Sequence, residues 1–306
     1  MDCTGASIQE WSDEILASRS AEELRGIAVE GSIKGFGPYF MYGVTDSVLD
    51  LTSERKIQIP SCNTHCLTSI IWALSLEGTE LNRFRQVICF IDRRNQDKGK
   101  PGDAVHTLTY EPIKDENFGT HQAKDAVKVL KLALKEKFPE HLRIVSHAQK
   151  SPQPFMHATY LAITVEGVWT KEMVLDRLAS FRPPSSDGAS AHSLPPFIAV
   201  TDYFSMGQVY EEYCVQGLAS RGYDYAVVLN HQIQLVSWPC GKSCNKPLED
   251  ETETTFSTIM LSTLTPQEGN VLISNLACSL KFLYPSDYKR RVNSIIEREH
   301  LLFGVV

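Results

Sequence analysis

One cysteine of this chain stands where a predicted strand gives way to a predicted helix. The run Ser61-Cys62-Asn63-Thr64 follows an alternating segment, residues 56–60, and precedes apolar residues at helical spacing over 63–76. The dipole and the N–H groups at a helix start lower the pKa of a thiol and can stabilise an oxyanion on an attacked carbonyl. Position alone makes a nucleophile an alternative to a cysteine that is simply buried in the core, which is the more common case.

A histidine and two arginines elsewhere have the chemistry to assist such a thiol. His157 could act as its base. Arg93 and Arg94, after a predicted strand at 85–91, could grip an anion, or could be a solvated strand end. His121, just before a predicted helix at 124–138, could join them or merely cap that helix.

The elements that must position these residues predict an α+β fold. Several strands follow one another without helices between them, which indicates a mostly antiparallel or mixed sheet. Residues 182–196 are rich in Pro, Ser and Gly and are expected to form a surface insertion. Helices are expected at 9–25, 63–76, 124–138, 170–180, 266–282 and 288–302, and strands at 56–60, 85–91, 160–165, 197–200, 225–229, 233–236 and 258–261.

The order of these segments resembles the archaeal-type (class II) glyceraldehyde-3-phosphate dehydrogenases over most of the chain. The resemblance implies that Cys62 is the nucleophile and that Phe155-Met156-His157 supplies the base. Two further segments resemble substrate-site segments of that family, so the resemblance implies a substrate or anion site formed with Asn63 and Thr64. Those segments are Arg93-Arg94 with the downstream Lys98-Gly99, and Gly119-Thr120-His121.

The chain departs from that family at its start. Met1-Asp2-Cys3-Thr4 resembles a strand midway through the family's nucleotide domain, so the glycine-rich first unit is missing. Gly35-Phe36-Gly37 continues as Pro38-Tyr39-Phe40, which does not complete the dinucleotide pattern. His65-Cys66 replaces small or hydroxyl residues and puts the substrate-phosphate contacts in question. The resemblance then implies a truncated Rossmann-like remnant at 1–60, a dehydrogenase-like catalytic α+β domain at 61–287, and a terminal helix at 288–306 that packs back on the remnant.

Without a dinucleotide site no cofactor is expected, and this restricts the substrates on which Cys62 can act. A cysteine that attacks an aldehyde needs a hydride acceptor before a thioester can form, so the substrate must already be at the acyl level. The prediction is therefore a cofactor-independent acyltransferase that forms a thioester on Cys62, with His157 protonating the leaving group and activating the second nucleophile. There are two alternatives. The first is an NAD(P)-dependent phosphorylating aldehyde dehydrogenase, which either binds NAD in an altered form or is represented here by a chain that lacks its first segment. The second is a catalytically inactive interaction protein.

A basic stripe follows His121 and suggests a polyanionic carrier. Lysines recur at helical spacing on one face and could track phosphates, although such a face is often only solvated. An ester on a polyanion suggests aminoacyl-tRNA, and cyclodipeptide synthesis, as in the fungal arginine-containing cyclodipeptide synthases, is one such chemistry. Carboxylates that could hold a cationic side chain are Asp202, Glu211 and Glu212. The stripe consists of Lys124, Lys128, Lys131 and Lys135.

Composition and cysteine spacing argue against nucleic-acid-binding, membrane-spanning, secreted and metal-binding proteins. The formal charge of −7 over 306 residues disfavours a whole-protein nucleic-acid binder, and no apolar run is long enough for a membrane span. No secretory signal is visible, so a cytoplasmic protein is expected. The pairs Cys62/Cys66 and Cys240/Cys244 lack the usual zinc spacing, so no metal site is expected. By analogy with the same family, the protein is expected to be a homo-oligomer.

Overall fold

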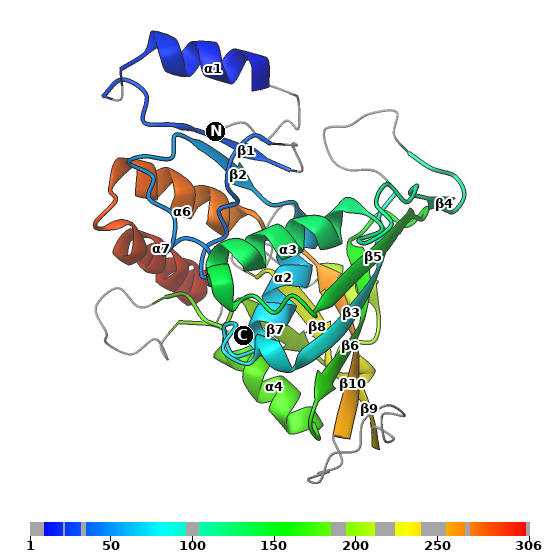
Figure 1. The fold of residues 1–306 in the computed structure, drawn as a ribbon. Coiled ribbons are helices and arrows are strands. Elements are labelled where there is room, and N and C mark those ends of the chain that lie inside the picture. Colours follow the sequence, from blue (N-terminus) through cyan, green and yellow to red (C-terminus); the bar gives the residue numbers. More distant parts are fainter. Residues whose placement is uncertain are drawn as a thin grey trace, which may run out of the picture.

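The computed structural model describes residues 9–20, 22–31, 35–95, 104–184, 194–211, 224–239, 255–266 and 270–303. These residues form a mixed α/β structure with one eight-stranded sheet and a separate pair of parallel strands (Figure 1). The expectation of an α+β fold with a mixed sheet is confirmed at this level. The parallel pair consists of β1 (Ile27–Glu30) and β2 (Lys56–Ile59).

The large sheet has the strand order β4-β5-β3-β6-β10-β8-β7, with β9 paired to β10. The pairs β3–β5 and β7–β8 are parallel, and the other pairs are antiparallel. The longest strands, β6 and β10, lie side by side, and their register sets His157 opposite Thr265. The strands are β3 (Phe84–Arg93), β4 (Thr109–Tyr110), β5 (Arg143–Lys150), β6 (His157–Glu166), β7 (Ile198–Thr201), β8 (Ala226–Leu229), β9 (Gln234–Pro239) and β10 (Thr255–Thr265).

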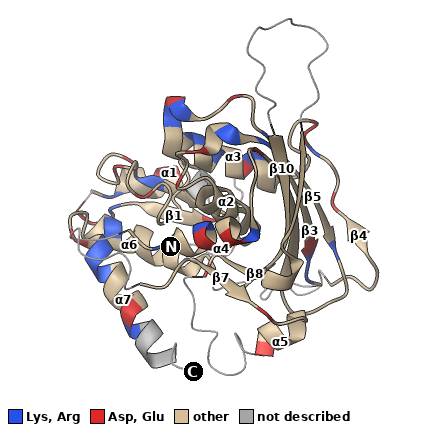
Figure 2. Cartoon of the chain, turned by 90° about the horizontal axis from the view of Figure 1, so that it is seen from below, with Lys and Arg blue, Asp and Glu red and all other residues tan. Residues whose placement is uncertain are grey.

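Helices gather on one side of this sheet (Figure 2). Central among them is α2, in which every residue from Asn63 to Leu74 is buried. Helix α3 packs beside α2, and its Ala123 N–H donates to the Ser146 hydroxyl of β5. The described α-helices are α1 (Gln9–Ser18), α2 (Cys62–Leu74), α3 (His121–Leu134), α4 (Lys171–Ser180), α5 (Met206–Tyr210), α6 (Leu272–Leu283) and α7 (Tyr288–Phe303).

The two faces of the sheet differ in burial because strand residues alternate between them. Odd-numbered residues of β3, β6 and β10, such as Cys89 and Ile163, are buried under α2 and α3. On the opposite side, the short helix α5 covers only one end, where Val209 packs against Ala158 and Leu264. The remainder stays partly exposed and is called the open face here; its apolar residues are Ile88, Phe90, Tyr160, Ala162, Val236, Trp238 and Met260.

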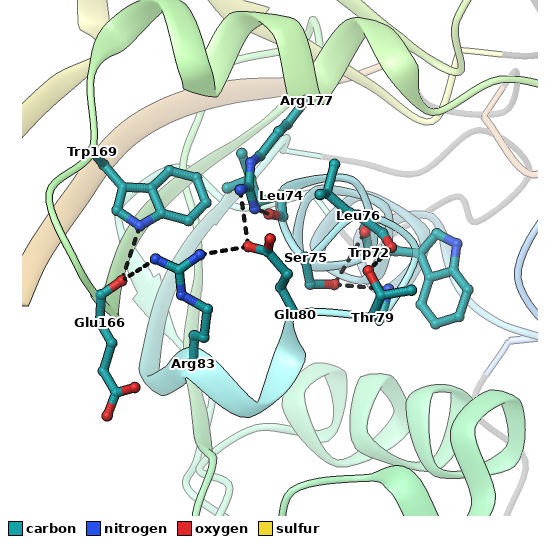
Figure 3. Close-up of polar contacts among 11 residues, drawn as sticks. Trp72, Leu74, Ser75, Leu76, Thr79, Glu80, Arg83, Glu166, Trp169 and Arg177 are labelled. Atoms are coloured by element: carbon teal, nitrogen blue, oxygen red, sulfur yellow. Dashed lines mark hydrogen bonds and ion pairs between the residues drawn. The ribbon is translucent and has the colours of Figure 1, made fainter.

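A polar cluster locks the C-terminal end of α2 (Figure 3). The Glu80 carboxylate accepts from Arg83 at 2.8 Å and from Arg177 of α4 at 2.9 Å. Arg177 also donates to the Leu74 carbonyl at 2.6 Å, and its guanidinium stacks 4.2 Å from the ring centroid of Trp169. Since the last carbonyls of a helix have no partner within it, Arg177 acts as a side-chain cap for α2.

The last two helices pack on the segment between β1 and β2. The Tyr288 hydroxyl of α7 donates to the Asp46 carboxylate at 2.7 Å, and the Tyr42 hydroxyl donates to Asn293 at 3.0 Å. From α6, the Lys281 ammonium donates to the Asp46 and Leu49 carbonyls. Residues far apart in sequence therefore form one buried polar layer.

The predicted elements occur with changed boundaries. Helix α1 ends at Ser18 rather than at 25. Just beyond it, the Ser20 N–H donates to the Glu23 carboxylate and the Glu23 N–H donates to the Ser20 hydroxyl. Helix α6 begins at Leu272 rather than at 266. Thr170 caps α4 as expected, because its hydroxyl accepts the Met173 N–H. Strands β1, β4 and β5 and helix α5 were not predicted.

Candidate functional site

Cys62 is the first residue of α2. Two residues after β2 ends, Ser61 adopts the extended conformation of an N-cap, and the helix begins with the His65 N–H bonded to the Ser61 carbonyl at 2.9 Å. The Cys62 side chain is half-buried, whereas Cys66, one turn later, is fully buried. The strand-to-helix position expected for a nucleophile is therefore present, with the N–H groups of the first turn at the helix end.

Contacts of Cys66 show where α2 starts relative to the sheet. Its thiol lies 3.1 Å from the Thr263 hydroxyl and also contacts Thr265 and Thr159. These threonines occupy the end of the sheet at which β6 begins and β10 ends. Cys62 is one turn closer to the start of α2 and therefore belongs to this same end. Burial raises the pKa of the Cys66 thiol despite the threonine hydrogen bonds, so Cys66 is a structural cysteine.

His157 lies at this end as the first residue of β6, and it is buried. Its Nδ1 accepts the backbone N–H of Arg94 at 2.9 Å. Because a backbone N–H can only donate, Nδ1 is unprotonated and the neutral ring carries its proton on Nε2. In this tautomer His157 donates from Nε2. Acting as a base at Nε2 requires the other tautomer and loss of the Arg94 contact.

The arginines and His121 converge at the end of β3. Arg93 forms an ion pair with Glu111, and Arg94 is buried. His121 starts α3, and burial lowers its pKa; Asp125 and Glu111 act in the opposite direction. The predicted anion-binding residues are therefore close to one another. Sequence reasoning missed two carboxylates near these residues, those of Glu111 and Asp125. Because Glu111 pairs with Arg93, an incoming anion would have to compete with Glu111 for Arg93.

Asn63 and Thr64 are both buried in the first turn of α2. The Thr64 hydroxyl lies 3.0 Å from the Ser61 hydroxyl. A residue that sequence reasoning missed contacts the backbone of Cys62: Asn270 donates its amide to the Cys62 carbonyl at 2.8 Å. No sequence pattern marks Asn270, because a single asparagine before a helix is common.

Three of the four lysines in the stripe on α3 have carboxylate partners. Lys124 pairs with Asp115 at 2.8 Å, Lys128 with Asp125 at 3.2 Å, and Lys131 with Glu140 at 3.0 Å. Figure 2 shows these charges along α3. The stripe therefore carries much less net positive charge than its four lysines, including Lys135, suggest. Exposed ion pairs are weak, so a phosphate could displace the carboxylates.

The acidic candidates follow β7 and α5. Asp202 accepts the Asn230 amide at 2.7 Å, and Glu211 follows α5, which packs on the side of the sheet opposite α2. Other predicted features lie outside the described residues: the N-terminal Asp-Cys-Thr segment, Lys98-Gly99, Glu212, Cys240, Cys244 and residues 185–193 of the expected insertion.

No model of a known protein family matches this chain, and a search of curated proteins also found no match. Within the described part of the chain, no helix is long and apolar enough to span a membrane. Among the same residues, no three His, Cys, Asp or Glu side chains gather closely enough to hold a metal ion.

His65, one turn after Ser61, makes the stability of this site depend on pH. Its imidazole is fully buried, and burial lowers its pKa from 6.5 to about 4. The unfolded chain binds this proton below 6.5 and the folded chain only below about 4, so stability falls as the pH drops through that window. We expect a loss of about 3 kcal/mol in unfolding free energy from this group alone. Urea unfolding of wild type and His65→Asn at pH 7 and pH 4 checks this, because the variant should show a smaller drop.

Proposed function

We propose that this protein is a cysteine-dependent acyltransferase in which Cys62 carries the acyl group as a thioester. The observation that carries the proposal is the half-buried Cys62 at the start of α2, above the end of the sheet where His157 begins β6. This arrangement supplies a thiolate-stabilising helix terminus and an imidazole at one end of the sheet.

The transfer proceeds in two steps. The Cys62 thiolate attacks the carbonyl carbon of an ester, so that a C–S bond forms and the C–O bond to the leaving group breaks; the leaving oxygen takes its proton from water. In the second step an amine attacks the thioester, a C–N bond forms, the C–S bond breaks, and the amine proton passes to the released Cys62 sulfur. Amide N–H groups of the first turn of α2 stabilise the oxyanion in both steps.

His157 assists through its Nε2. The hydrogen bond from Arg94 to Nδ1 supports a donor role in the resting protein, with Nε2–H directed to the oxyanion or to the leaving oxygen. The base role expected from the sequence needs a proton on Nδ1, in place of that hydrogen bond.

For the acyl donor we propose aminoacyl-tRNA, with a cyclic dipeptide as one possible product. The lysines on α3 and the arginines at the end of β3 lie near one another, since His121 begins α3 and interacts with Arg93. A polyanion would have to displace the carboxylate partners of these cations.

At the level of fold we propose that the eight-stranded sheet is a dehydrogenase-like catalytic domain. The parallel pair β1–β2 with α1 would then correspond to a reduced Rossmann-like unit. The support is the ordered set of segments in the sequence together with the mixed sheet.

The proposal is tested by incubating the protein with charged and uncharged tRNA pools and reading its intact mass. We expect an aminoacyl adduct that is lost in Cys62→Ala and retained in Cys66→Ser, whose hydroxyl can keep the contact with Thr263. Small-molecule products are read from the same reaction. Absence of an adduct together with NAD-dependent aldehyde oxidation would establish a dehydrogenase instead, and absence of both activities would favour an interaction protein.

We also propose that the open face forms a homodimer interface. Its large apolar side chains are exposed by 37% (Phe90) to 49% (Tyr160), and its central residues are uncharged. A two-fold axis brings the residues closest to it near their own copies, so an uncharged centre suits self-association. Tyr160→Glu should convert a dimer into a monomer in sedimentation velocity, whereas Val168→Glu, at an exposed valine outside this face, should not. A wild-type monomer at micromolar concentration would refute the proposal.

A further inference from the structure

Two side chains connect the start of α2 to the start of α6. Asn270, two residues before α6, donates its amide to the Cys62 carbonyl at 2.8 Å and to the Tyr225 carbonyl at 3.2 Å. From α2, the His65 Nε2 lies 2.9 Å from the Ser274 hydroxyl in the first turn of α6. Asn270, His65 and Ser274 are each fully buried.

The hydrogen-bond directions in this layer are determined by its backbone groups. The Tyr42 N–H donates to the Ser274 oxygen at 3.1 Å, and the His65 Nδ1 lies 3.2 Å from the Ser61 carbonyl. A carbonyl only accepts, so Nδ1 carries the proton and Nε2 accepts from the Ser274 hydroxyl. The low pKa of His65 keeps the ring neutral near pH 7, which preserves this order.

The carbonyls on both sides of Cys62 thus receive an added side-chain hydrogen bond. The Ser61 carbonyl accepts from the His65 ring, and the Cys62 carbonyl accepts from Asn270. These carbonyls belong to the two peptide planes that flank the Cα of Cys62. Holding both planes restricts the φ and ψ angles of Cys62 and therefore the direction of its thiol relative to the N–H groups of the first turn.

We infer that His65 and Asn270 are positioning residues for Cys62, which hold its thiol in line with the start of α2. The inference rests on the proposed role of Cys62 as nucleophile. A helix terminus alone frays, and a thiol that turns away from it loses the stabilisation of its thiolate. The two side chains do not touch the substrate; they act through the backbone of Cys62.

The test is the rate of alkylation of Cys62 by iodoacetamide at pH 7, with the site located by peptide mapping. Asn270→Leu removes both amide hydrogen bonds while roughly keeping the side-chain volume, and we expect alkylation about 10-fold slower. Asn275→Leu is the matched control: Asn275 is another buried amide, on α6, whose recorded contact is with Glu30. We expect this control to stay within about two-fold of wild type.

Two substitutions of His65 separate the ends of its ring. The amide nitrogen of His65→Asn occupies the place of Nδ1 and can still donate to the Ser61 carbonyl, so alkylation should stay within about two-fold of wild type. The amide of His65→Gln reaches instead toward Ser274, and alkylation should slow about 10-fold. His65→Gln serves as the second variant should Asn270→Leu not fold, and Ser274→Ala, which loses the same contact as His65→Asn, should stay within about two-fold of wild type.

Thermal unfolding of each variant separates positioning from stability alone. Melting temperatures that fall while every variant is alkylated at the wild-type rate would overturn the inference. Slower alkylation in Asn270→Leu and His65→Gln, at a temperature where each is folded, supports it. Failure of the proposed function gives a different result: wild type forms no acyl adduct, while the alkylation rates still report on the position of Cys62.

Discussion

Replacing His157 with alanine is expected to slow acyl transfer through Cys62 by about 10²–10³-fold, which is the usual loss when one hydrogen-bond donor to an oxyanion is removed. Glutamine at this position is expected to recover about 10-fold of that loss, because its amide N–H can donate from near the place of Nε2. The reason is the Arg94 N–H, which occupies Nδ1 and leaves Nε2 as the donor. The measurement is the time course of adduct formation on charged tRNA, followed by intact mass.

The matched control is His141→Gln, at a histidine that contacts the Asn82 and Phe84 carbonyls at the start of β3, the far end from His157. This variant should react at the wild-type rate. Equal rates for His157→Ala and His157→Gln would assign the base role to His157 and contradict the donor role. Wild-type rates in both would remove His157 from the reaction.

The Arg177→Met variant is expected to lose about 3 kcal/mol of unfolding free energy, the lower range for breaking a mostly buried ion pair. Arg177 donates to the Leu74 carbonyl and the Glu80 carboxylate and stacks on Trp169, as Figure 3 shows. Its removal takes this cap from the end of α2. Glu80 then keeps its hydrogen bond from Arg83 but loses the one from Arg177. Urea unfolding measures the loss.

Comparison variants separate the ion pair from the other contacts. Arg83→Met should cost less, because the Arg83 side chain is 34% exposed and that of Arg177 only 11%. A double-mutant cycle of Arg177→Met with Glu80→Gln isolates their coupling. Adduct formation per folded molecule should not change, since this cluster lies at the opposite end of α2 from Cys62. A loss below about 1 kcal/mol for Arg177→Met would contradict the prediction.

The half-buried carboxylate of Glu80 adds a pH dependence with a definite sign. Burial raises its pKa, but the hydrogen bond and charge of Arg177 and then of Arg83 outweigh burial, so the pKa lies below its ordinary value of 4.5. The cluster therefore contributes its stability above that value and loses it as the pH falls through the lowered pKa.

Local patterns were sufficient for the elements with a strong period. Helix α2 has apolar residues at helical spacing and was predicted close to its observed bounds, whereas the alternation of β6 predicted 160–165 and missed its first three residues, His157 among them. Strand β5 was missed because its buried residues include Ser146 and Ala148, which do not stand out in an apolar alternation. Strand β1 has only four residues and offers too short a pattern.

The sequence by itself determined the residue types, the strand-to-helix position of Cys62 and the face shared by the lysines of α3, because each depends on neighbours within a few positions. Only the tertiary structure decided which partners those residues meet. The β6–β10 register brings His157 to the end of the sheet where α2 starts, and Asn270 comes from more than 200 positions away to bond the Cys62 carbonyl. Asp115 and Glu140 reach the lysines from outside α3. Hydrogen bonds and ion pairs act over a few ångströms in space, so contacts between distant segments are set by the packing of the sheet and its helices rather than by local spacing.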